Sequence, residues 1–301
     1  MDKKNILHKI QEAEEQIKRI EKYIGPGIFR KIKRIIFSPR FYFFYLLLKF
    51  GLINNMKKVK LIWGKEMCVN LDDIFNIILY LYGIPPYIDL KSTKFCLKNF
   101  KKYDVFYDIG ANYGYYTALA SEICNEVHSF EPNPYIFNIL KENFNKDNIY
   151  LNNLAVSDKK GECSLLLAGA SSSIIDEVKL FLKTKSNFKN EIKCLSIKLD
   201  DYIKNNKPPT FIKMDIEGAE FFAIKGGLNF FKNHSPVILM EVVLNETFGK
   251  ERQKLSKEAV LMLLDLGFKM YRITESGNMK LIDFYTYKSN LDYDNFVFIK
   301  Y

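Results

Sequence analysis

The sequence contains few of the residues on which histidine-based catalysis and structural metal sites depend. Its 301 residues include three histidines and five cysteines, and no two cysteines form a Cys-x-x-Cys pair. A zinc site of the usual ligand spacing is therefore not expected. The number of cysteines is odd and no signal peptide precedes them, which favours free thiols in a reducing compartment. We predict a cytoplasmic protein without a bound metal ion.

The sequence also lacks a hydrophobic run that could cross a membrane. The aromatic and aliphatic run at residues 41–48 has eight residues, whereas a transmembrane helix needs about 20. Pro39, Arg40 and Lys49 bracket this run. Any contact that it makes with a membrane is expected to lie in the plane of the lipid surface.

Acidic residues are scarce near the N-terminus. Residues 1–60 contain 15 Lys and Arg but 5 Asp and Glu, whereas the whole chain contains 45 and 35, which leaves 30 of each for residues 61–301. The net charge of +10 thus belongs to the first 60 residues. A neutral main part argues against nucleic acid bound along a basic face.

The first residues of the chain predict a helix with one apolar seam. The seam follows a heptad rhythm at Ile6, Ile10, Ala13, Ile17, Ile20 and Ile24, and Gly25-Pro26-Gly27 ends the helix. We assign residues 1–27 to this heptad helix. Residues 1–24 either pair with a second copy in a homo-oligomer or pack on the parent domain, and the sequence leaves both open.

A basic amphipathic segment and the aromatic run follow the glycine-proline break. Residues 28–37 place Arg30, Lys31, Lys33 and Arg34 beside a face of isoleucines, and the run at 41–50 comes next. We assign residues 28–57 to one membrane-proximal segment. For residues 28–53 we predict a peripheral contact with an anionic membrane surface. A core helix with a solvated basic edge is the alternative.

A glycine-bearing turn between a strand and a helix is the main signal in the rest of the chain. An apolar strand at 105–107 leads into Asp108-Ile109-Gly110-Ala111-Asn112-Tyr113-Gly114, and a helix is expected from about 115 to 123. Gly110 and Gly114 allow a tight turn and a close approach to a ligand. Glu131 ends a second strand, 21 positions after Gly110. It is placed to accept hydrogen bonds from both hydroxyls of a ribose.

The turn lacks the glycine pattern that a pyrophosphate requires. Dinucleotide enzymes use Gly-x-Gly-x-x-Gly, but Asn112 and Tyr115 stand at the second and third glycine positions here. The negative charge of Asp108 suits a cation better than a phosphate. A ribose with a cationic tail is found in S-adenosylmethionine, which we predict as the cofactor. A plain connection between a strand and a helix is the alternative, against which Asp108 and Glu131 argue.

Further motifs downstream carry a resemblance to a known family. They are Phe130-Glu131-Pro132-Asn133, Asn153-Leu154-Ala155-Val156-Ser157-Asp158, Leu199-Asp200-Asp201 and Lys213-Met214-Asp215-Ile216-Glu217-Gly218-Ala219-Glu220. Over residues 100–245 the chain resembles the FkbM-type methyltransferases, a family of S-adenosylmethionine-dependent O-methyltransferases. The resemblance implies an α/β, class I methyltransferase (Rossmann-like) fold with a doubly wound, seven-stranded sheet whose last strand is antiparallel. We assign this domain to residues 58–301, behind an N-terminal helical appendage.

The predicted site draws its residues from the ends of several strands. The residues predicted to bind the methionine end of the cofactor are Asp108, Gly110, Asn112 and Gly114. Glu131 is predicted to bind the ribose, and the backbone of Ala155 and Val156 is predicted to lie at the rim of the adenine. Asp215 is predicted to face the methyl group as the catalytic base, with Glu217 as its partner. The alternative for Glu217 is a carboxylate that stabilises the helix start at 218–220. We expect His128 and His234 to be structural.

These features predict an enzyme that methylates a hydroxyl of a sugar in a surface glycan, including a lipid-linked one. The resemblance implies sugars or polyketide natural products as acceptors, so a small natural product or a lipid is an alternative. A nicotinamide-dependent sugar oxidoreductase would share the first strand-helix-strand unit. A non-catalytic membrane adaptor would account for residues 1–53. We expect the protein in the cytoplasm, with the inner face of the membrane as its place of contact.

Overall fold

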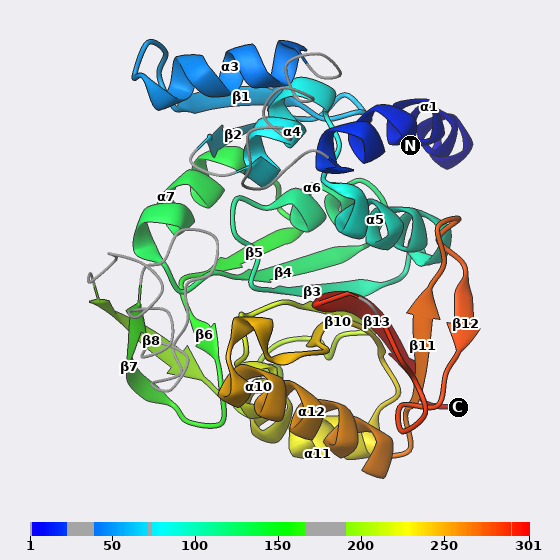
Figure 1. Cartoon of the computed structure of the whole chain (residues 1–301). Coiled ribbons are helices and arrows are strands. Elements are labelled where there is room, and N and C mark those ends of the chain that lie inside the picture. The colour runs from blue at the N-terminus through cyan, green and yellow to red at the C-terminus, as the bar shows by residue number, and fades with distance from the viewer. Residues whose placement is uncertain (1, 23–38, 72–73, 167–190, 290) are drawn as a thin grey trace. The chain divides into compact units, whose positions relative to one another are not determined.

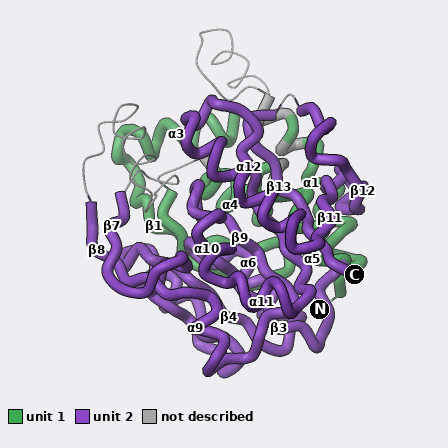
Figure 2. The backbone as a smooth tube through the Cα atoms, turned by 90° about the horizontal axis from the view of Figure 1, so that it is seen from below, with its two compact units in different colours: residues 1–98 green, residues 99–301 purple. Residues whose placement is uncertain are grey.

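The computed structural model describes residues 2–22, 39–71, 74–166, 191–289 and 291–301. The chain divides into two compact units, Met1–Lys98 and Asn99–Tyr301 (Figure 2). The domain boundary at residue 58 stays a prediction. Within the described ranges, no helix is long and apolar enough to cross a membrane.

The first unit combines helices with one hairpin. Its elements are α1 (Lys3–Lys22), α3 (Pro39–Lys49), β1 (Met56–Lys60), β2 (Glu66–Asn70), α4 (Ile74–Tyr82) and most of α5 (Tyr87–Asn99). The sequence predicts a hairpin over residues 58–70 that turns at Gly64-Lys65, and β1 indeed pairs antiparallel with β2 around Gly64. The basic amphipathic segment predicted at residues 28–37 lies outside the described residues.

Helix α1 buries part of its apolar seam. Ile6 and Ile10 are buried, and Glu14 forms a salt bridge of 2.6 Å with Lys94 of α5. At these positions the seam already contacts its own chain. Pairing of two copies through residues 1–24 stays a prediction.

The second unit is built on a mixed sheet of eight strands. They are β3 (Val105–Ile109), β4 (Glu126–Phe130), β5 (Ile149–Asn152), β9 (Phe211–Met214), β10 (Val237–Val243), β11 (Lys269–Ile273), β12 (Met279–Leu281) and β13 (Tyr293–Ile299). Their order is β12-β11-β13-β10-β9-β3-β4-β5 (Figure 1), and β13 runs antiparallel to β10. This confirms the doubly wound class I methyltransferase fold. The edge strand β12 is an eighth strand that the sequence does not predict.

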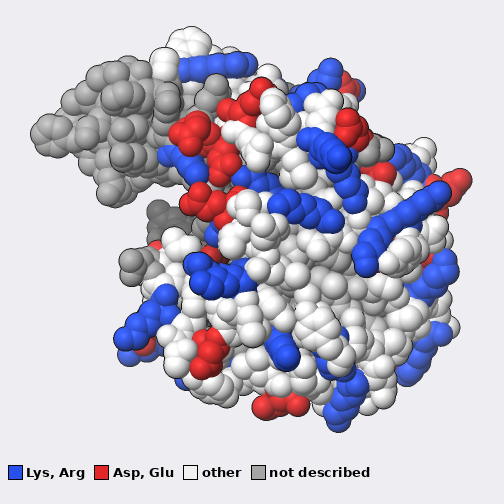
Figure 3. Space-filling view, turned by 90° about the vertical axis from the view of Figure 1, so that its right-hand side faces the viewer, with Lys and Arg blue, Asp and Glu red and all other residues white. Residues whose placement is uncertain are grey.

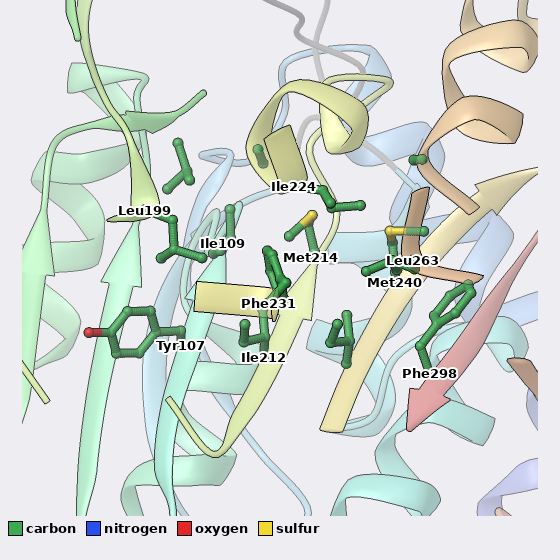
Figure 4. Packing of buried hydrophobic residues seen from close by; sticks show 14 of the residues in the cluster. Tyr107, Ile109, Leu199, Ile212, Met214, Ile224, Phe231, Met240, Leu263 and Phe298 are labelled. Atoms are coloured by element: carbon green, nitrogen blue, oxygen red, sulfur yellow. The ribbon is translucent and has the colours of Figure 1, made fainter. Parts of the chain in front are cut away.

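Helices cover the faces of this sheet. They are α6 (Tyr115–Ser121), α7 (Pro134–Asn143), α9 (Leu199–Ile203), α10 (Glu220–Gly226), α11 (Leu228–Asn233) and α12 (Lys250–Asp265), with a short 3-10 helix at Glu246–Phe248. Figure 4 shows side chains of β3, β9 and β10 packing with Phe231 of α11 and Leu263 of α12. β3 and β9 are buried throughout because nearly all of their side chains are apolar.

A separate sheet of three strands follows β5. Its strands are β6 (Ala155–Val156), β7 (Gly161–Leu166) and β8 (Glu191–Ile197), with β8 in the middle. The sequence predicts strands at 162–167 and 192–197, and β7 and β8 are present there and pair antiparallel. The sequence also predicts a polar loop with Gly169 and three serines at 171–173, which lies outside the described residues. Among the described residues, the five cysteines form no disulfide bond.

Basic and acidic side chains lie interspersed on the surface. On the face drawn in Figure 3, Lys and Arg alternate with Asp and Glu and with uncharged areas.

The chain leaves β3 at the point where the strand order reverses. β4 lies on one side of β3 and β9 on the other. The N–H of Asp215 donates to the carbonyl oxygen of Ile109 at 3.1 Å, which continues the pairing beyond the end of β9. A Cβ at Gly110 would lie 2.0 Å from the carbonyl oxygen of Asp215. Only glycine lets the turn after β3 pass so close to the loop after β9.

We expect Gly110→Ala to lower the free energy of unfolding by about 3 kcal/mol or more, because it combines a strained φ with a backbone clash. Gly267→Ala is the matched control. Gly110 has φ +85 and Gly267 has φ +89, but the nearest atom to a Cβ at Gly267 is a side-chain carbon of Lys300 at 3.6 Å. That control should lose about 1 kcal/mol. Urea unfolding followed by circular dichroism measures both, and equal losses would contradict the close approach.

Candidate active site

The predicted cofactor turn begins at a fully buried carboxylate. Oδ2 of Asp108 accepts a hydrogen bond of 2.7 Å from the hydroxyl of Thr117 on α6. That hydroxyl also lies 2.7 Å from the hydroxyl of Ser129 on β4. Burial raises the pKa of Asp108, whereas the charge of Lys213 and the bond from Thr117 oppose the rise. The carboxylate is thus held in place through one oxygen.

Two acceptor atoms of this turn are buried without a hydrogen-bond partner in the part of the chain that the structure describes. They are Oδ1 of Asp108 and Oδ1 of Asn112. A buried polar atom left unpaired costs roughly 1–3 kcal/mol. Both atoms accept rather than donate, so the group that would satisfy them carries N–H or O–H donors. A positive charge on that group would also compensate the buried carboxylate of Asp108.

Glu131 directly follows β4, and backbone amides fix both of its oxygens. Oε1 accepts from the N–H of Asn133 and Oε2 from the N–H of Asn112, each at 2.9 Å. Burial raises the pKa of Glu131 to about 7, although these two hydrogen bonds lower it. Each carboxylate oxygen can accept a further hydrogen bond. Asn112 reaches Glu131 from a left-handed conformation with φ 51, which asparagine tolerates better than most residues.

The glycines of the turn are also needed for packing within the protein. A Cβ at Gly110 would meet the backbone of Asp215, and a Cβ at Gly114 would lie 2.3 Å from the ring of Phe144 and 2.6 Å from Leu140. Both glycines have positive φ. Their proposed contact with a cofactor stays a prediction.

The segment assigned to the adenine lies next to the end of β4. The side-chain amide of Asn153 donates to the carbonyl oxygen of Glu131 at 2.8 Å. Ala155 and Val156 follow as the buried strand β6, and Val156 belongs to the main hydrophobic core. Their backbone pairs with β8, and its proposed contact with the adenine stays a prediction.

Asp215 directly follows β9 and is held by a buried lysine. Nζ of Lys213 lies 2.9 Å from Oδ2 of Asp215, and the same ammonium lies 5.1 Å from the centre of the Tyr116 ring. Lys213 is buried whereas Asp215 is half-buried. The ion pair thus fixes one oxygen of a carboxylate that remains accessible beside Gly110.

Arg252 of α12 bridges the two other carboxylates at this edge of the sheet. Its Nη2 lies 2.6 Å from Oε2 of Glu217 and 2.7 Å from Oε2 of Glu241 on β10. Glu217 has a positive φ of 58, a conformation that is strained for a residue of its kind. The bridge therefore ties the strained loop after β9 to the neighbouring strand.

Glu220, and not Glu217, stabilises the start of helix α10. It is the first residue of α10, and its carboxylate accepts from the N–H of Ile216 at 2.9 Å and of Gly218 at 3.4 Å. These are N–H groups that precede the helix and have no intrahelical partner. Glu217 instead pairs with Arg252.

Burial dominates the electrostatics of this cluster. It raises the pKa of Glu217 and of Glu241, and the charge of Arg252 opposes both shifts. Burial by itself would lower the pKa of Arg252, but the two carboxylates raise it above its ordinary value. Within the described ranges, no group of three or more His, Cys, Asp or Glu has the arrangement to hold a metal ion.

Arg252 and Lys213 are residues of this cluster whose roles the sequence alone does not reveal. α12 begins at Lys250, whereas the sequence predicts a helix from 256 to 266. The buried residues of α12 are Arg252, Leu255, Ser256, Ala259, Val260 and Leu263. A positive charge on the buried stripe of an amphipathic helix is the signal that could have identified Arg252.

Neither histidine singled out in the sequence lies in this cluster. Nε2 of His128 lies 2.8 Å from Oε1 of Glu126, and its Nδ1 lies 2.7 Å from the hydroxyl of Tyr202. His234 follows α11 and stacks on Phe230. Burial lowers the pKa of His128. Each ring thus has contacts with its local neighbours.

We expect Arg252→Gln to lower the free energy of unfolding by about 3 kcal/mol at pH 8, because it leaves two partly buried carboxylates without their cation. Without Arg252 the folded-state pKa of both carboxyls rises further above the ordinary value of 4.5. Carboxyls with a raised folded-state pKa lose stability as the pH increases from the unfolded to the folded value. The loss should therefore be smaller at pH 5 than at pH 8.

Arg272→Gln is the control for this variant, because Arg272 is exposed on β11 of the same unit. Its loss should stay within about 0.5 kcal/mol at both pH values. Urea titrations at pH 5 and pH 8 measure the four differences. A loss for Arg252→Gln that is the same at both pH values would contradict the assigned electrostatics.

Comparison with known proteins gives matches to methyltransferases. A protein-family model, the methyltransferase FkbM domain, matches residues 108–270. The hexuronic acid methyltransferase AglP of Haloferax volcanii is 26% identical over 144 residues, which cover 45% of this chain and 55% of that protein. The chain therefore spans about half the length of this curated relative.

Solved structures also match. The methyltransferase FkbM from Methylobacillus flagellatus is 17% identical and has a TM-score of 0.43, over 67% of this chain and 44% of that one. TYW2 from M. jannaschii, in complex with AdoMet, is 14% identical and has a TM-score of 0.41, over 83% of this chain and 88% of that one.

Proposed function

The chain belongs to the methyltransferase FkbM family, and we propose that it transfers a methyl group from S-adenosylmethionine to a hydroxyl of a sugar in a surface glycan. The observation that carries the choice of cofactor is the pair of buried acceptor atoms without a partner, on Asp108 and Asn112, in the described part of the chain. The name of the relative from Haloferax volcanii, a hexuronic acid methyltransferase, supports a sugar as the acceptor.

The donor and acceptor chemistry of the turn fits this cofactor. Asp108 and Asn112 offer acceptor oxygens and a negative charge for an ammonium group. Glu131 offers an acceptor on each of two fixed oxygens for the two hydroxyls of a ribose. The backbone at Ala155 and Val156 lies nearby for the adenine. S-adenosylmethionine, when bound, supplies an electrophilic methyl group on a sulfonium.

Asp215 is the proposed base for the acceptor hydroxyl. A sugar hydroxyl is a weak nucleophile, so a carboxylate that takes its proton as the new bond forms accelerates the transfer. Asp215 lies against Gly110 of the cofactor turn, and Lys213 holds one of its oxygens. Glu217 acts as a partner that anchors the same loop through Arg252. Such positioning of the reacting groups is itself worth several kcal/mol.

We expect the affinity for S-adenosylhomocysteine to fall as the pH decreases through about 7, the pKa of Glu131. The ionised carboxylate accepts from both ribose hydroxyls, whereas a proton on one oxygen removes an acceptor. Glu131→Gln should weaken binding by about 5- to 150-fold, which corresponds to roughly 1–3 kcal/mol, and should flatten this pH dependence. Glu142→Gln, exposed on α7, should do neither. Calorimetry from pH 6 to pH 8.5 measures the affinity of each variant for S-adenosylhomocysteine. Undiminished affinity of Glu131→Gln would overturn the assignment of Glu131 to the ribose.

We expect Asp215→Asn to keep its affinity for S-adenosylhomocysteine but to lose about 10²- to 10⁴-fold in turnover, the scale of a general base. The assay follows transfer of a labelled methyl group to glycan and lipid-linked glycan extracts. His234→Gln is the control and should remain active, since its ring stacks on Phe230 away from the acidic cluster. Full activity of Asp215→Asn on a verified acceptor would contradict its role.

The same experiments distinguish the other functions. If the labelled methyl group appears on lipids or on small natural products and not on glycans, the acceptor belongs to that other class. Binding of NAD in place of S-adenosylhomocysteine would favour an oxidoreductase. Binding of neither ligand would favour a non-catalytic adaptor.

A further inference from the structure

Helix α3 of the first unit has one packed face and one exposed apolar face. Phe41 is buried, and Phe44 stacks on Tyr80 of α4 with ring centres 5.0 Å apart. On the other face Phe43 is 63% exposed, and Phe50 and Leu52, just beyond the helix, are each 68% exposed. Phe43 and Phe50 are seven positions apart, so they lie on the same side of the helix. We call Phe43, Phe50 and Leu52 the apolar edge.

An ordered turn holds the apolar edge in place. Gly51 follows the helix with φ +65. Its N–H donates to the carbonyl oxygen of Leu48 at 3.0 Å, and the N–H of Leu52 donates to that of Leu47 at 2.9 Å. This is the hydrogen-bond pattern of a Schellman motif. Phe50 and Leu52 are therefore exposed by a fixed backbone and not by a frayed helix end.

The segment that carries the apolar edge is basic, although Lys58 in it pairs with Glu66 of β2 at 2.7 Å. Residues 39–65 contain six basic residues and no acidic one. Arg40 and Lys49 belong to α3 itself and are exposed, as is Lys60 on β1. Apolar side chains surrounded by basic ones complement an anionic lipid surface. The apolar side chains enter the membrane interface, and the basic side chains contact the anionic headgroups.

The length and charge of this segment decide between occupants. α3 has 11 residues, about half the number that a membrane-spanning helix needs. A symmetric contact between two copies would place equal basic surfaces against each other, which like charges oppose. An anionic membrane surface meets neither objection. We propose that the apolar edge and the basic residues of α3 bind the surface of an anionic membrane in its plane.

The proposal goes beyond methyl transfer and uses the described residues 39–60 alone. Since anionic lipids are concentrated in the cytoplasmic leaflet, it places the protein at the inner face of the membrane. An acceptor attached to a lipid would then be held near the enzyme, which raises its effective concentration.

Vesicle flotation of the full-length protein tests the proposal. One vesicle set contains phosphatidylcholine alone and the other contains added phosphatidylglycerol at about one third of the lipid. We expect the protein to float with the anionic vesicles at low salt, to be released at high salt, and not to float with the neutral ones. Failure to float with anionic vesicles at low salt would overturn the proposal, and so would equal flotation with both sets.

The variant Phe43→Ser/Phe50→Ser/Leu52→Ser is expected to reduce the bound fraction about tenfold. Leu195→Ser/Leu281→Ser is the matched control, because these leucines of the second unit are 54% and 56% exposed and should leave binding unchanged. Binding of S-adenosylhomocysteine and circular dichroism verify that each variant is folded.

Two further outcomes would contradict the proposed membrane contact. If the triple variant floats as well as the unchanged protein, the apolar edge is not the contact. If it instead converts a dimer to a monomer in sedimentation, the edge joins two copies and the proposal is wrong. No outcome depends on methyl transfer, so failure here is distinguishable from failure of the proposed function.

Discussion

The hydrogen bond from the N–H of Asp215 to the carbonyl oxygen of Ile109 joins the two loops on which the candidate site depends. It extends the pairing of β3 and β9 beyond the strand ends, where the order of the sheet reverses. Because the two loops lie in backbone contact at Gly110, the turn assigned to the cofactor and the carboxylate assigned to the acceptor cannot move independently. Methyl transfer requires the sulfur, the methyl carbon and the acceptor oxygen to lie in line. Because the two loops are already fixed relative to each other, less conformational entropy has to be lost when the substrates bind.

The cost of the site lies in its buried carboxylates. Asp108, Glu131, Glu217, Glu220 and Glu241 all have a pKa raised by burial. Four of them are compensated locally: backbone amides bind Glu131 and Glu220, and Arg252 binds Glu217 and Glu241. Asp108 is bound at one oxygen, by the hydroxyl of Thr117. Removing one partner of such a pair leaves a buried charge, which is why these contacts act as a unit and not as separate contributions. The strained φ of Glu217 persists only because the surrounding bridge fixes it.

The sequence predicted the parts of this structure whose causes are local. The turn at Gly110, the strands on either side of it and the hairpin around Gly64 follow from glycine conformation and apolar patterning over a few residues. Arg252 was missed because its role arises from the packing of α12 against β10, which brings together residues 11 positions apart in the chain. The sequence left a helix-start role open for Glu217 because Glu217 and Glu220 both stand near the start of α10. Three-dimensional contacts decide which carboxylate accepts from the amides there, and it is Glu220. β12 has three exposed residues, too short a pattern to be recognised.

The candidate site has more fixed acceptors than donors, and this imbalance limits what can complete it. Oδ1 of Asp108 and Oδ1 of Asn112 have no donor in the described part of the chain, and each oxygen of Glu131 has room for one more. Nζ of Lys213 and Nη2 of Arg252 are already bound to carboxylates, whereas Nε of Arg252 is buried without a partner among the described residues. A ligand that brings phosphates would add further acceptors and negative charge to this edge. A ligand that brings an ammonium group and a pair of hydroxyls supplies donors where the protein lacks them, and this complementarity favours a sulfonium nucleoside over a dinucleotide.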